Sequence, residues 1–283
     1  MFIGSEGTLG IATEVTVRLA PRPSVLRGLV VPLPARVRLG LLAVRLGQAA
    51  DTGLSAVEYL DHYSASGLAD ERGAPWAGRS ALLLLEVEAE SEQEAERRTG
   101  RIRAVLVRNG VPARPQVFPD ADRLWDLRGE SGRVMDEQLG SRIREDVAVP
   151  PARVDELLAA VRRIARRENV AVHTFAHLGE GSLHPNIVVD PASAAARRIR
   201  RALYAETLRL GGTISAEHGV GRLKRAFLEQ EVGPVAVRLL RAVRDACDPD
   251  GILNPGKLYP PPRARGRSSR SPSGSGSGRT RSV

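Results

Sequence analysis

Short apolar runs alternate with longer amphipathic segments along the chain, a pattern that predicts strands connected by helices. Residues 13–19 alternate polar and apolar side chains, so Val15, Val17 and Leu19 should form one face of a strand. Strands are predicted at 13–19, 25–31, 54–60, 81–87, 113–118, 144–149, 170–177 and 184–189. Helices are predicted at 35–50, 91–108, 151–168, 192–210 and 222–246. This order is typical of βαβ-like units.

Boundary residues support the predicted helices. Ser91 followed by Glu94 resembles a capping box. Asn169 should end one helix, and Gly233-Pro234 should interrupt the last one. The fold class that follows is α+β: a largely antiparallel sheet with helices packed on one face, built from ferredoxin-like βαβ units and followed by a C-terminal helical segment.

The charge of the chain is unevenly distributed. The formal net charge is +9, but residues 261–283 hold six arginines and no acid, so the remainder carries only +3. This Ser-, Gly- and Arg-rich tail has almost nothing apolar to bury, and we expect it to be disordered. A body with balanced charge gives no reason to expect a specific nucleic-acid partner.

Cysteine content and hydropathy bear on the cellular compartment in which the protein is expected. The single cysteine, Cys247, argues against a disulfide framework and against a cysteine-based metal cage. No apolar run approaches the roughly 20 residues that a membrane-spanning helix needs. The first residues have neither the charged leader nor the apolar region of a signal peptide. We therefore expect a cytoplasmic protein, at most peripheral to the inner membrane surface.

Four of the five histidines lie between residues 173 and 218. If residues 179–182 form a hairpin loop, His177 faces His184 directly across an antiparallel pair, with Cβ atoms about 5 Å apart. Two imidazoles at that spacing can share one metal ion. The alternative is that both are ordinary polar strand residues or a hydrogen-bonded pair.

The glycine-rich segment 211–221 contains Glu217 and His218, and glycine lets the backbone approach a ligand closely. Glu217 can complete a set of two histidines and one glutamate, which leaves an open position on zinc. His218 is then free to act as a general base, because an imidazole titrates near neutral pH. Alternatively, Glu217 only orients His218, or the loop is an anion-binding turn.

Two arginines are candidates for binding a carboxylate. Arg128 follows Trp125, and Arg144 precedes the acidic pair at 145–146. A guanidinium group can clamp a carboxylate through two parallel hydrogen bonds. In a chain so rich in arginine, either residue is equally compatible with an ordinary surface charge.

Four blocks of the sequence together resemble the FAD-linked oxidases of the vanillyl-alcohol-oxidase type. The blocks are residues 2–11, 177–186, 211–221 and 253–257. They are similar to the family's flavin-contacting loop, its H-x-G-D-G-N-x-H-x-N segment, its G-G-x-x-S-G-E-H-G-x-G loop and its closing L-N-P-G-K. The branch is the one that contains D-lactate dehydrogenase, D-2-hydroxyglutarate dehydrogenase and the glycolate oxidase flavin subunit, and the resemblance covers about residues 1–260.

This resemblance implies FAD-dependent oxidation of a 2-hydroxy acid by hydride transfer to the flavin. His218 would be the base that takes the hydroxyl proton. The implied ligands of a divalent metal, with zinc as one candidate, are His177, His184 and Glu217. The implied substrate contacts are Arg128, Arg144 and Asn186, with Arg128 also counted as catalytic. The implied flavin contacts are Gly4, Ser5, Glu6, Gly7, Thr8, Gly10, Ile11 and Asn254.

Three positions depart from the family pattern: Glu180, Ser182 and Ala216 stand where it has Asp, Asn and Gly. These changes could reshape the hairpin or narrow the pocket.

The family's FAD domain would precede this sequence by roughly 150–200 residues. We therefore expect residues 1–23 to be a remnant of that domain, 24–260 to be the substrate (cap) domain, and 261–283 to be the tail. The expected partners are a small 2-hydroxy acid and the missing FAD domain, either as the rest of a truncated gene or as a separate chain. Alone, the chain should bind FAD weakly or not at all. The alternatives are a non-catalytic subunit and a metal-dependent hydrolase.

Overall fold

The computed structural model describes residues 2–66, 68, 73, 80–112 and 114–259. The predicted tail, 261–283, and position 113 of one predicted strand lie outside these residues. Within the described part of the chain, no helix is both long and apolar enough to cross a membrane.

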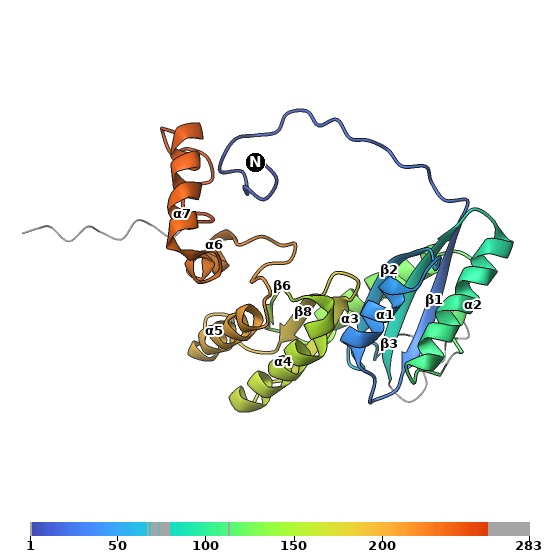
Figure 1. The fold of residues 1–283 in the computed structure, drawn as a ribbon. Helices are drawn as coiled ribbons and strands as arrows, with labels where there is room; N and C mark the ends of the chain where they lie inside the picture. The colour runs from blue at the N-terminus through green and yellow to red at the C-terminus, as the bar shows by residue number, and fades with distance from the viewer. Residues whose placement is uncertain (1, 67, 69–72, 74–79, 113, 260–283) are drawn as a thin grey trace, which may run out of the picture.

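The first half of the fold is a ferredoxin-like unit (Figure 1). Its elements are β1 (Val25–Leu33), α1 (Leu39–Gln48), β2 (Leu54–Leu60), β3 (Ala81–Ala89), α2 (Glu92–Arg108) and β4 (Gln116–Phe118). The strands lie in the order β4-β1-β3-β2, and each neighbouring pair is antiparallel. The helix α2 begins where the sequence predicts, because Ser91 caps it through the backbone N–H of Glu94, whereas α1 begins at Leu39 and not at residue 35.

The second half extends the same sheet beyond β2. Its strands are β5 (Ile143–Arg144), β6 (Val147–Ala148), β7 (Val172–His177) and β8 (Ser182–Ile187), and its helices are α4 (Val154–Glu168) and α5 (Ala194–Arg209). A 3-10 turn, η2 (Pro151–Arg153), precedes α4. β7 joins β2, β8 joins β7, and both β5 and β6 pair with β8, all antiparallel. The single strand predicted at 144–149 is thus divided into two at Glu145 and Asp146.

One continuous core fills the space between the sheet and four helices. Alternate residues of each strand, such as Leu29 and Val31 of β1, point into it. The helices α1, α2, α4 and α5 contribute one apolar face each. The predicted fold class is therefore confirmed, including the antiparallel sheet and the layer of helices.

A further helix, α3 (Asp122–Gln138), covers part of the opposite face and was not predicted. Leu124 and Leu127 of α3 pack with Val30, Leu84 and Phe118 of the sheet. Few apolar residues and two glycines weaken its helical periodicity, so the sequence gives no strong signal. Tertiary packing forms this helix, and it brings Arg128 to the sheet.

The predicted strand at 13–19 is wrong, because residues 10–23 form neither helix nor strand. Val15, Val17 and Leu19 are exposed. A strand needs a neighbour to satisfy its backbone groups and to cover its apolar face, and the described residues provide none here. In Figure 1 this segment runs as an open arc from β1 towards the C-terminal helices.

The C-terminal part comprises α6 (Gly221–Lys224) and α7 (Leu228–Cys247). As predicted, the last helix is kinked at Gly233, which has a positive φ of 79° beside Pro234. Leu228 and Val237 pack with Leu258 in a small separate core. Figure 1 shows α7 beside the N-terminal loop.

Candidate metal and substrate site

Polar side chains gather on the face of the sheet that α1, α2, α4 and α5 leave free. Alternation along β2, β7 and β8 directs Glu58, His177 and His184 to that face, whereas their neighbours enter the main core. The strand register places Glu58 opposite His177 and Phe175 opposite His184. Residues far apart in sequence therefore form one polar row across three strands.

The two histidines are diagonal neighbours, so the predicted direct pairing is wrong. His177 pairs with Ser182, and His184 pairs with Phe175. The expected register is displaced by two residues, and an even displacement keeps both imidazoles on the same face. Their ring centroids are 5.0 Å apart. The turn requires Gly181, which has a φ of +78°, and a Cβ atom there would lie 1.9 Å from a backbone carbonyl oxygen.

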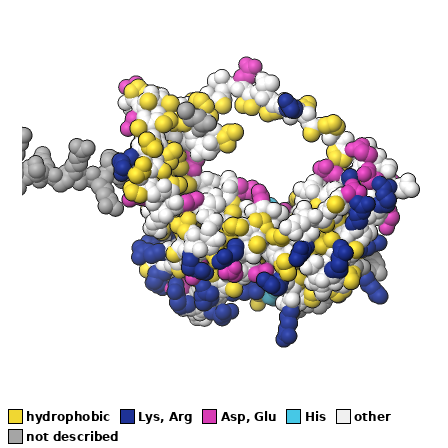
Figure 2. Space-filling view, in the orientation of Figure 1, with side chains coloured by type: hydrophobic (Ala, Val, Ile, Leu, Met, Phe, Trp, Pro, Cys, Tyr) yellow, Lys and Arg dark blue, Asp and Glu magenta, His cyan; other side chains and the backbone are white. Residues whose placement is uncertain are grey.

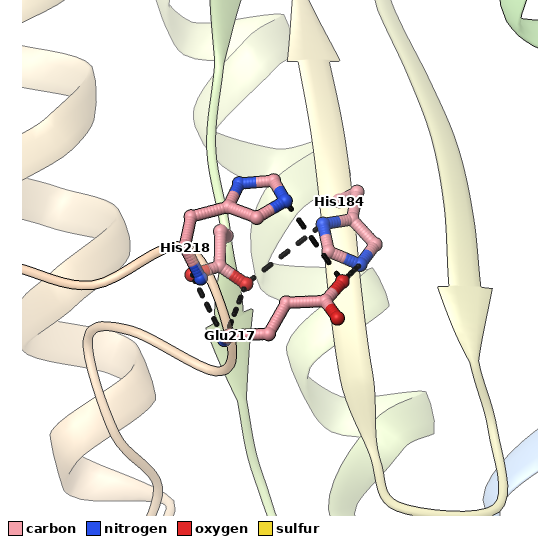
Figure 3. A group of neighbouring side chains, drawn as sticks. His184, Glu217 and His218 are labelled. Atoms are coloured by element: carbon pink, nitrogen blue, oxygen red, sulfur yellow. Dashed lines mark hydrogen bonds and ion pairs between the residues drawn. The ribbon is translucent and has the colours of Figure 1, made fainter. Parts of the chain in front are cut away.

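Glu217 joins the two histidines. Its Oε1 atom lies 3.2 Å from Nε2 of His177 and 3.2 Å from Nε2 of His184. The three predicted metal ligands therefore converge, although two come from a hairpin and one comes from a distant loop. Figure 3 shows Glu217 and His218 pointing from this loop towards His184 on β8.

His184 is buried. Its side chain is 3% exposed, and among the described residues neither ring nitrogen has a hydrogen-bond partner, although Glu217 Oε1 lies 3.2 Å from Nε2. Phe175 stacks on the ring at a centroid distance of 4.7 Å. Burial, together with the neighbouring His177, lowers the pKa of His184 to about 4. A neutral imidazole with an unsatisfied nitrogen fits a metal ligand.

His177 is oriented by Glu58, a residue that the sequence analysis missed. Glu58 Oε1 lies 2.7 Å from His177 Nδ1, which leaves Nε2 directed at Glu217. The hydrogen bond with Glu58 raises the pKa of His177 above its usual value, against the effect of burial. A carboxylate behind a ligating histidine is a common feature of metal sites. The signal was present in the sequence as a single acid within the otherwise apolar strand 54–60.

Arg128 reaches the same row from α3. Its Nε atom donates to Glu58 Oε2 at 3.2 Å, and its guanidinium carbon lies 4.1 Å above the Phe175 ring. These two contacts hold the cation beside His177. The structure thus brings Arg128 next to the histidine pair, as a carboxylate-binding role would require.

Asp146 organises the loop that carries Glu217 and was also missed. Its buried Oδ2 accepts hydrogen bonds from the Ser215 hydroxyl at 2.9 Å and from the backbone N–H groups of Ala216 at 3.0 Å and His218 at 3.1 Å. Lys224 Nζ lies 3.3 Å from the same oxygen. Burial acts to raise the pKa of Asp146, but Lys224 and the N–H donors outweigh it and lower the pKa. The available signal was an acidic pair inside the predicted strand 144–149.

A second ligand set overlaps the predicted one. Ligand atoms of Asp146, His184, Glu217 and His218 all lie within 4.8 Å of one another. The two sets share His184 and Glu217 and differ in whether His177 contributes. Because the Oδ2 atom of Asp146 already accepts several hydrogen bonds, its Oδ1 atom is the one with capacity left for a cation.

Asn186 lies further along β8, and Arg144 is its partner in register on β5. Asn186 is buried and donates to the His184 carbonyl oxygen at 3.2 Å. Arg144 is exposed and pairs with Asp136 of α3 at 2.6 Å. The cation that contacts Asn186 is Arg142, whose Nε donates to Asn186 Oδ1 at 3.3 Å. Arg142 was not predicted, and no spacing rule distinguishes it from Arg144.

The predicted flavin loop, near the N-terminus, contacts residues of the C-terminal part of the described chain. The Glu6 carboxylate accepts from the backbone N–H groups of Val220 at 2.6 Å and Gly221 at 2.8 Å. Asn254 Nδ2 donates to the Glu6 carbonyl oxygen at 2.6 Å. A Cβ atom on Gly7 would lie 2.6 Å from Asn254 Nδ2, so this approach requires glycine.

The other loop residues predicted to contact the flavin differ in burial and packing. Thr8 is buried, and its hydroxyl donates to the Ser5 carbonyl oxygen at 2.7 Å. A Cβ on Gly10 would touch the ring of Phe2, whereas one on Gly4 would meet no atom within 4 Å. Ile11 is exposed. The loop therefore lies beside the segment that carries Glu217 and His218.

One family model and several known proteins match most of this chain. The sequence model of the family described as FAD linked oxidases, C-terminal domain, matches residues 29–258. The glycolate oxidase subunit GlcD of Bacillus subtilis is 29% identical over 272 residues, which are 92% of this chain and 56% of that protein. The D-lactate dehydrogenase of Archaeoglobus fulgidus is 30% identical over 261 residues, 91% of this chain and 57% of the relative. The chain thus spans little more than half the length of these relatives.

A solved structure shares the fold. The crystal structure of p-cresol methylhydroxylase with substrate bound superimposes with a TM-score of 0.61 and 13% sequence identity. The alignment covers 83% of this chain and 53% of that chain. At this identity the likeness concerns the fold alone.

Proposed function

The chain belongs to the family described as FAD linked oxidases, C-terminal domain, and we propose that it supplies the substrate site for FAD-dependent oxidation of a 2-hydroxy acid. The proposed substrates are D-lactate, glycolate and acids like D-2-hydroxyglutarate. The names of the relatives support this class, since they include a glycolate oxidase subunit and a D-lactate dehydrogenase. The division into a remnant at 1–23 and a substrate domain at 24–260 is part of the same proposal.

One observation carries the proposal: the convergence of two histidines on Glu217. Nε2 of His177 and Nε2 of His184 each lie 3.2 Å from the same carboxylate oxygen, and neither nitrogen of His184 accepts or donates a hydrogen bond within the described part of the chain. These donors fit a divalent cation such as zinc, which takes imidazole nitrogen and carboxylate oxygen. When bound there, the cation would act as a Lewis acid towards an oxygen of the substrate.

Arg128 is the proposed carboxylate-binding residue. Glu58 and Phe175 hold its guanidinium on the polar face, beside His177. A guanidinium can bind a carboxylate through two parallel hydrogen bonds, which fixes the orientation of a 2-hydroxy acid. Asn186 and Arg144 lie further along the same face and would contact the remainder of the substrate.

His218 is the proposed general base. Its side chain is 57% exposed, its Nε2 lies 3.8 Å from Glu217 Oε1, and its ring centroid is 5.1 Å from that of His184. A base in this position would remove the proton of the substrate hydroxyl. The flavin, when bound, supplies the acceptor for the hydride.

A flavin-binding domain is the proposed partner, in the same protein or in a second chain. Figure 2 shows hydrophobic side chains on α7 and along the N-terminal segment. Exposed residues there include Ile3, Ile11 and Leu19 of the N-terminal segment and Leu239 of α7. An apolar surface of this kind needs a cover, and it adjoins the loop of Glu6 and Asn254 that resembles a flavin contact.

The test is an activity measurement on the protein that combines this chain with its flavin domain. Reduction of a dye acceptor should depend on D-lactate, glycolate or D-2-hydroxyglutarate and should fall at least about a hundredfold in His218→Asn. Retention of bound FAD in that variant separates loss of the base from loss of the cofactor. Ester hydrolysis by the metal-loaded chain, without any hydroxy-acid oxidation, would instead support a hydrolase.

A further inference from the structure

A cavity of about 670 Å³ lies on the helix-covered face of the sheet. The polar row of Glu58, His177 and His184, called the histidine row below, lies on the other face. It is located where β1 ends at Leu33 and β3 begins at Ala81, beneath the start of α1 and the middle of α4. Its volume falls within the range of small-molecule binding sites, roughly 300–1,000 Å³. Nothing in the proposed oxidation uses this space.

The walls of the cavity combine apolar and polar side chains. Leu33, Val37, Leu39, Leu158 and Val172 line it and give an apolar ligand surface to pack against. Such a lining favours a ligand with a hydrocarbon or aromatic body.

Two arginines one helical turn apart add positive groups. Arg162 and Arg166 of α4 both line the cavity. Arg162 lies near Tyr59, which also lines the cavity, and its charge acts to lower the pKa of the Tyr59 hydroxyl against the larger effect of burial. Within the described part of the chain, the side chain of Arg166 forms no ion pair or hydrogen bond, so its guanidinium is available to a ligand.

Two acids also line the cavity, and the carboxylates of both are hydrogen-bonded to the backbone. Asp155 accepts from the backbone N–H groups of Leu39 at 2.8 Å and Gly40 at 3.1 Å, at the start of α1. Asp61 accepts from the N–H groups of Ser64 and Thr174 at 2.7 and 2.6 Å. Both carboxylates therefore already have hydrogen-bond donors from the backbone, whereas Arg166 still offers its own donors to a ligand.

We propose that this cavity binds a small organic carboxylate with an apolar body, the carboxylate at Arg162 and Arg166 and the body against the walls. The guanidinium fork matches a carboxylate, and Tyr59 lies beside it at the buried end. The site is separate from the histidine row, because Tyr59 faces the main core and the adjacent Glu58 faces the opposite side of the sheet.

Calorimetric titration of the full chain with 3-phenylpropanoate and with 3-phenylpropan-1-ol tests the proposal. The two probes share an apolar body and differ in the carboxylate. The acid should bind at least about tenfold more tightly than the alcohol, because a charge-assisted hydrogen bond exceeds a neutral one. Absence of measurable binding of the acid at millimolar concentration would overturn the proposal.

Four variants locate the binding. Arg166→Gln should weaken binding of the acid about tenfold, and Ala35→Trp, at an exposed position of the lining, should abolish it by filling the entrance. Arg163→Gln is the matched control, because Arg163 is on the same helix but pairs with Glu206. Arg128→Gln tests whether the acid binds on the histidine face instead. Loss of binding in Arg128→Gln, with wild-type binding in Arg166→Gln and Ala35→Trp, would contradict the cavity site.

Discussion

The buried carboxylate of Asp146 accepts a hydrogen bond of 3.1 Å from the backbone N–H of His218, 72 positions later in the chain. This bond and its neighbours hold the loop that carries Glu217 against the edge of the sheet. The geometry of the candidate metal site therefore depends on a residue that need not itself bind the metal.

Asp146→Asn should destabilise the protein and loosen the loop. The substitution removes the anion, turns an acceptor into a donor facing backbone N–H groups, and leaves Lys224 buried without its charge partner. Breaking a buried pair in this way costs about 3–5 kcal/mol, which urea unfolding measures. Asp126→Asn on the exposed face of α3 is the control. Equal unfolding free energies for the two variants would show that Asp146 does not organise the loop.

The stability of the metal-free protein should fall as the pH is lowered from about 6.5 to about 4, because of His184. Its folded-state pKa of about 4 lies below the unfolded value, so the unfolded state binds an extra proton in this window. Protonation therefore favours unfolding, by roughly 3 kcal/mol for a shift of this size. His177 affects the pH dependence in the opposite direction. Its pKa is raised in the folded state, so it stabilises the fold at a pH below its unfolded-state pKa, and this stabilisation is lost as the pH rises through the folded-state pKa.

Unfolding curves of wild type and His184→Gln across this window isolate the contribution of His184. The wild type should lose stability relative to the variant as the pH falls. Parallel pH profiles for the two proteins would rule out a buried neutral His184. Chelator is present throughout, so that metal release does not add to the slope.

The zinc affinities of two variants should show which of the two overlapping ligand sets binds the metal. If the metal is held by His177, His184 and Glu217, His177→Ala should weaken zinc binding by at least about tenfold and His218→Ala should not. The reverse result would assign the set that includes Asp146 and His218. Calorimetry with zinc measures both, and His62→Ala, an exposed histidine outside either set, is the control.

Arg128→Lys should raise KM for the 2-hydroxy acid about tenfold or more in the protein joined with its flavin domain. Lysine keeps the charge but loses the planar fork and the stacking on Phe175. Arg123→Gln, which removes a cation from the same helix and leaves the polar face intact, should have little effect. Steady-state kinetics with a dye acceptor checks both, and an unchanged KM in Arg128→Lys would contradict the proposed carboxylate contact.

Glu6→Ala should release the N-terminal loop from the segment that follows His218. The change removes the acceptor for the N–H groups of Val220 and Gly221. Limited proteolysis should then cut the first residues several times faster than in wild type, since exposed and unanchored chain is the preferred substrate. Glu14→Ala, an exposed acid in the same segment, is the control. Identical cleavage rates in the two variants would mean that Glu6 does not anchor the loop.

Local signals in the sequence were sufficient for most of the fold. The apolar runs predicted β1, β2 and β3, and the caps and breakers at Ser91, Asn169 and Gly233 were found as expected. These features are local, because they depend on side-chain period and on backbone preference at single positions. The strand at 13–19 has the same local pattern and still fails, since it lacks a neighbouring strand among the described residues.

The amino-acid sequence by itself determined the family, most of the strands and helices, and the residue types available for chemistry. Only the tertiary structure decided how these residues meet. The register of β7 and β8 made His177 and His184 diagonal neighbours, α3 brought Arg128 onto Glu58, and Asp146 fixed the loop of Glu217. The physical reason is that these contacts join positions far apart in the chain, where packing and burial, rather than local preference, select the geometry.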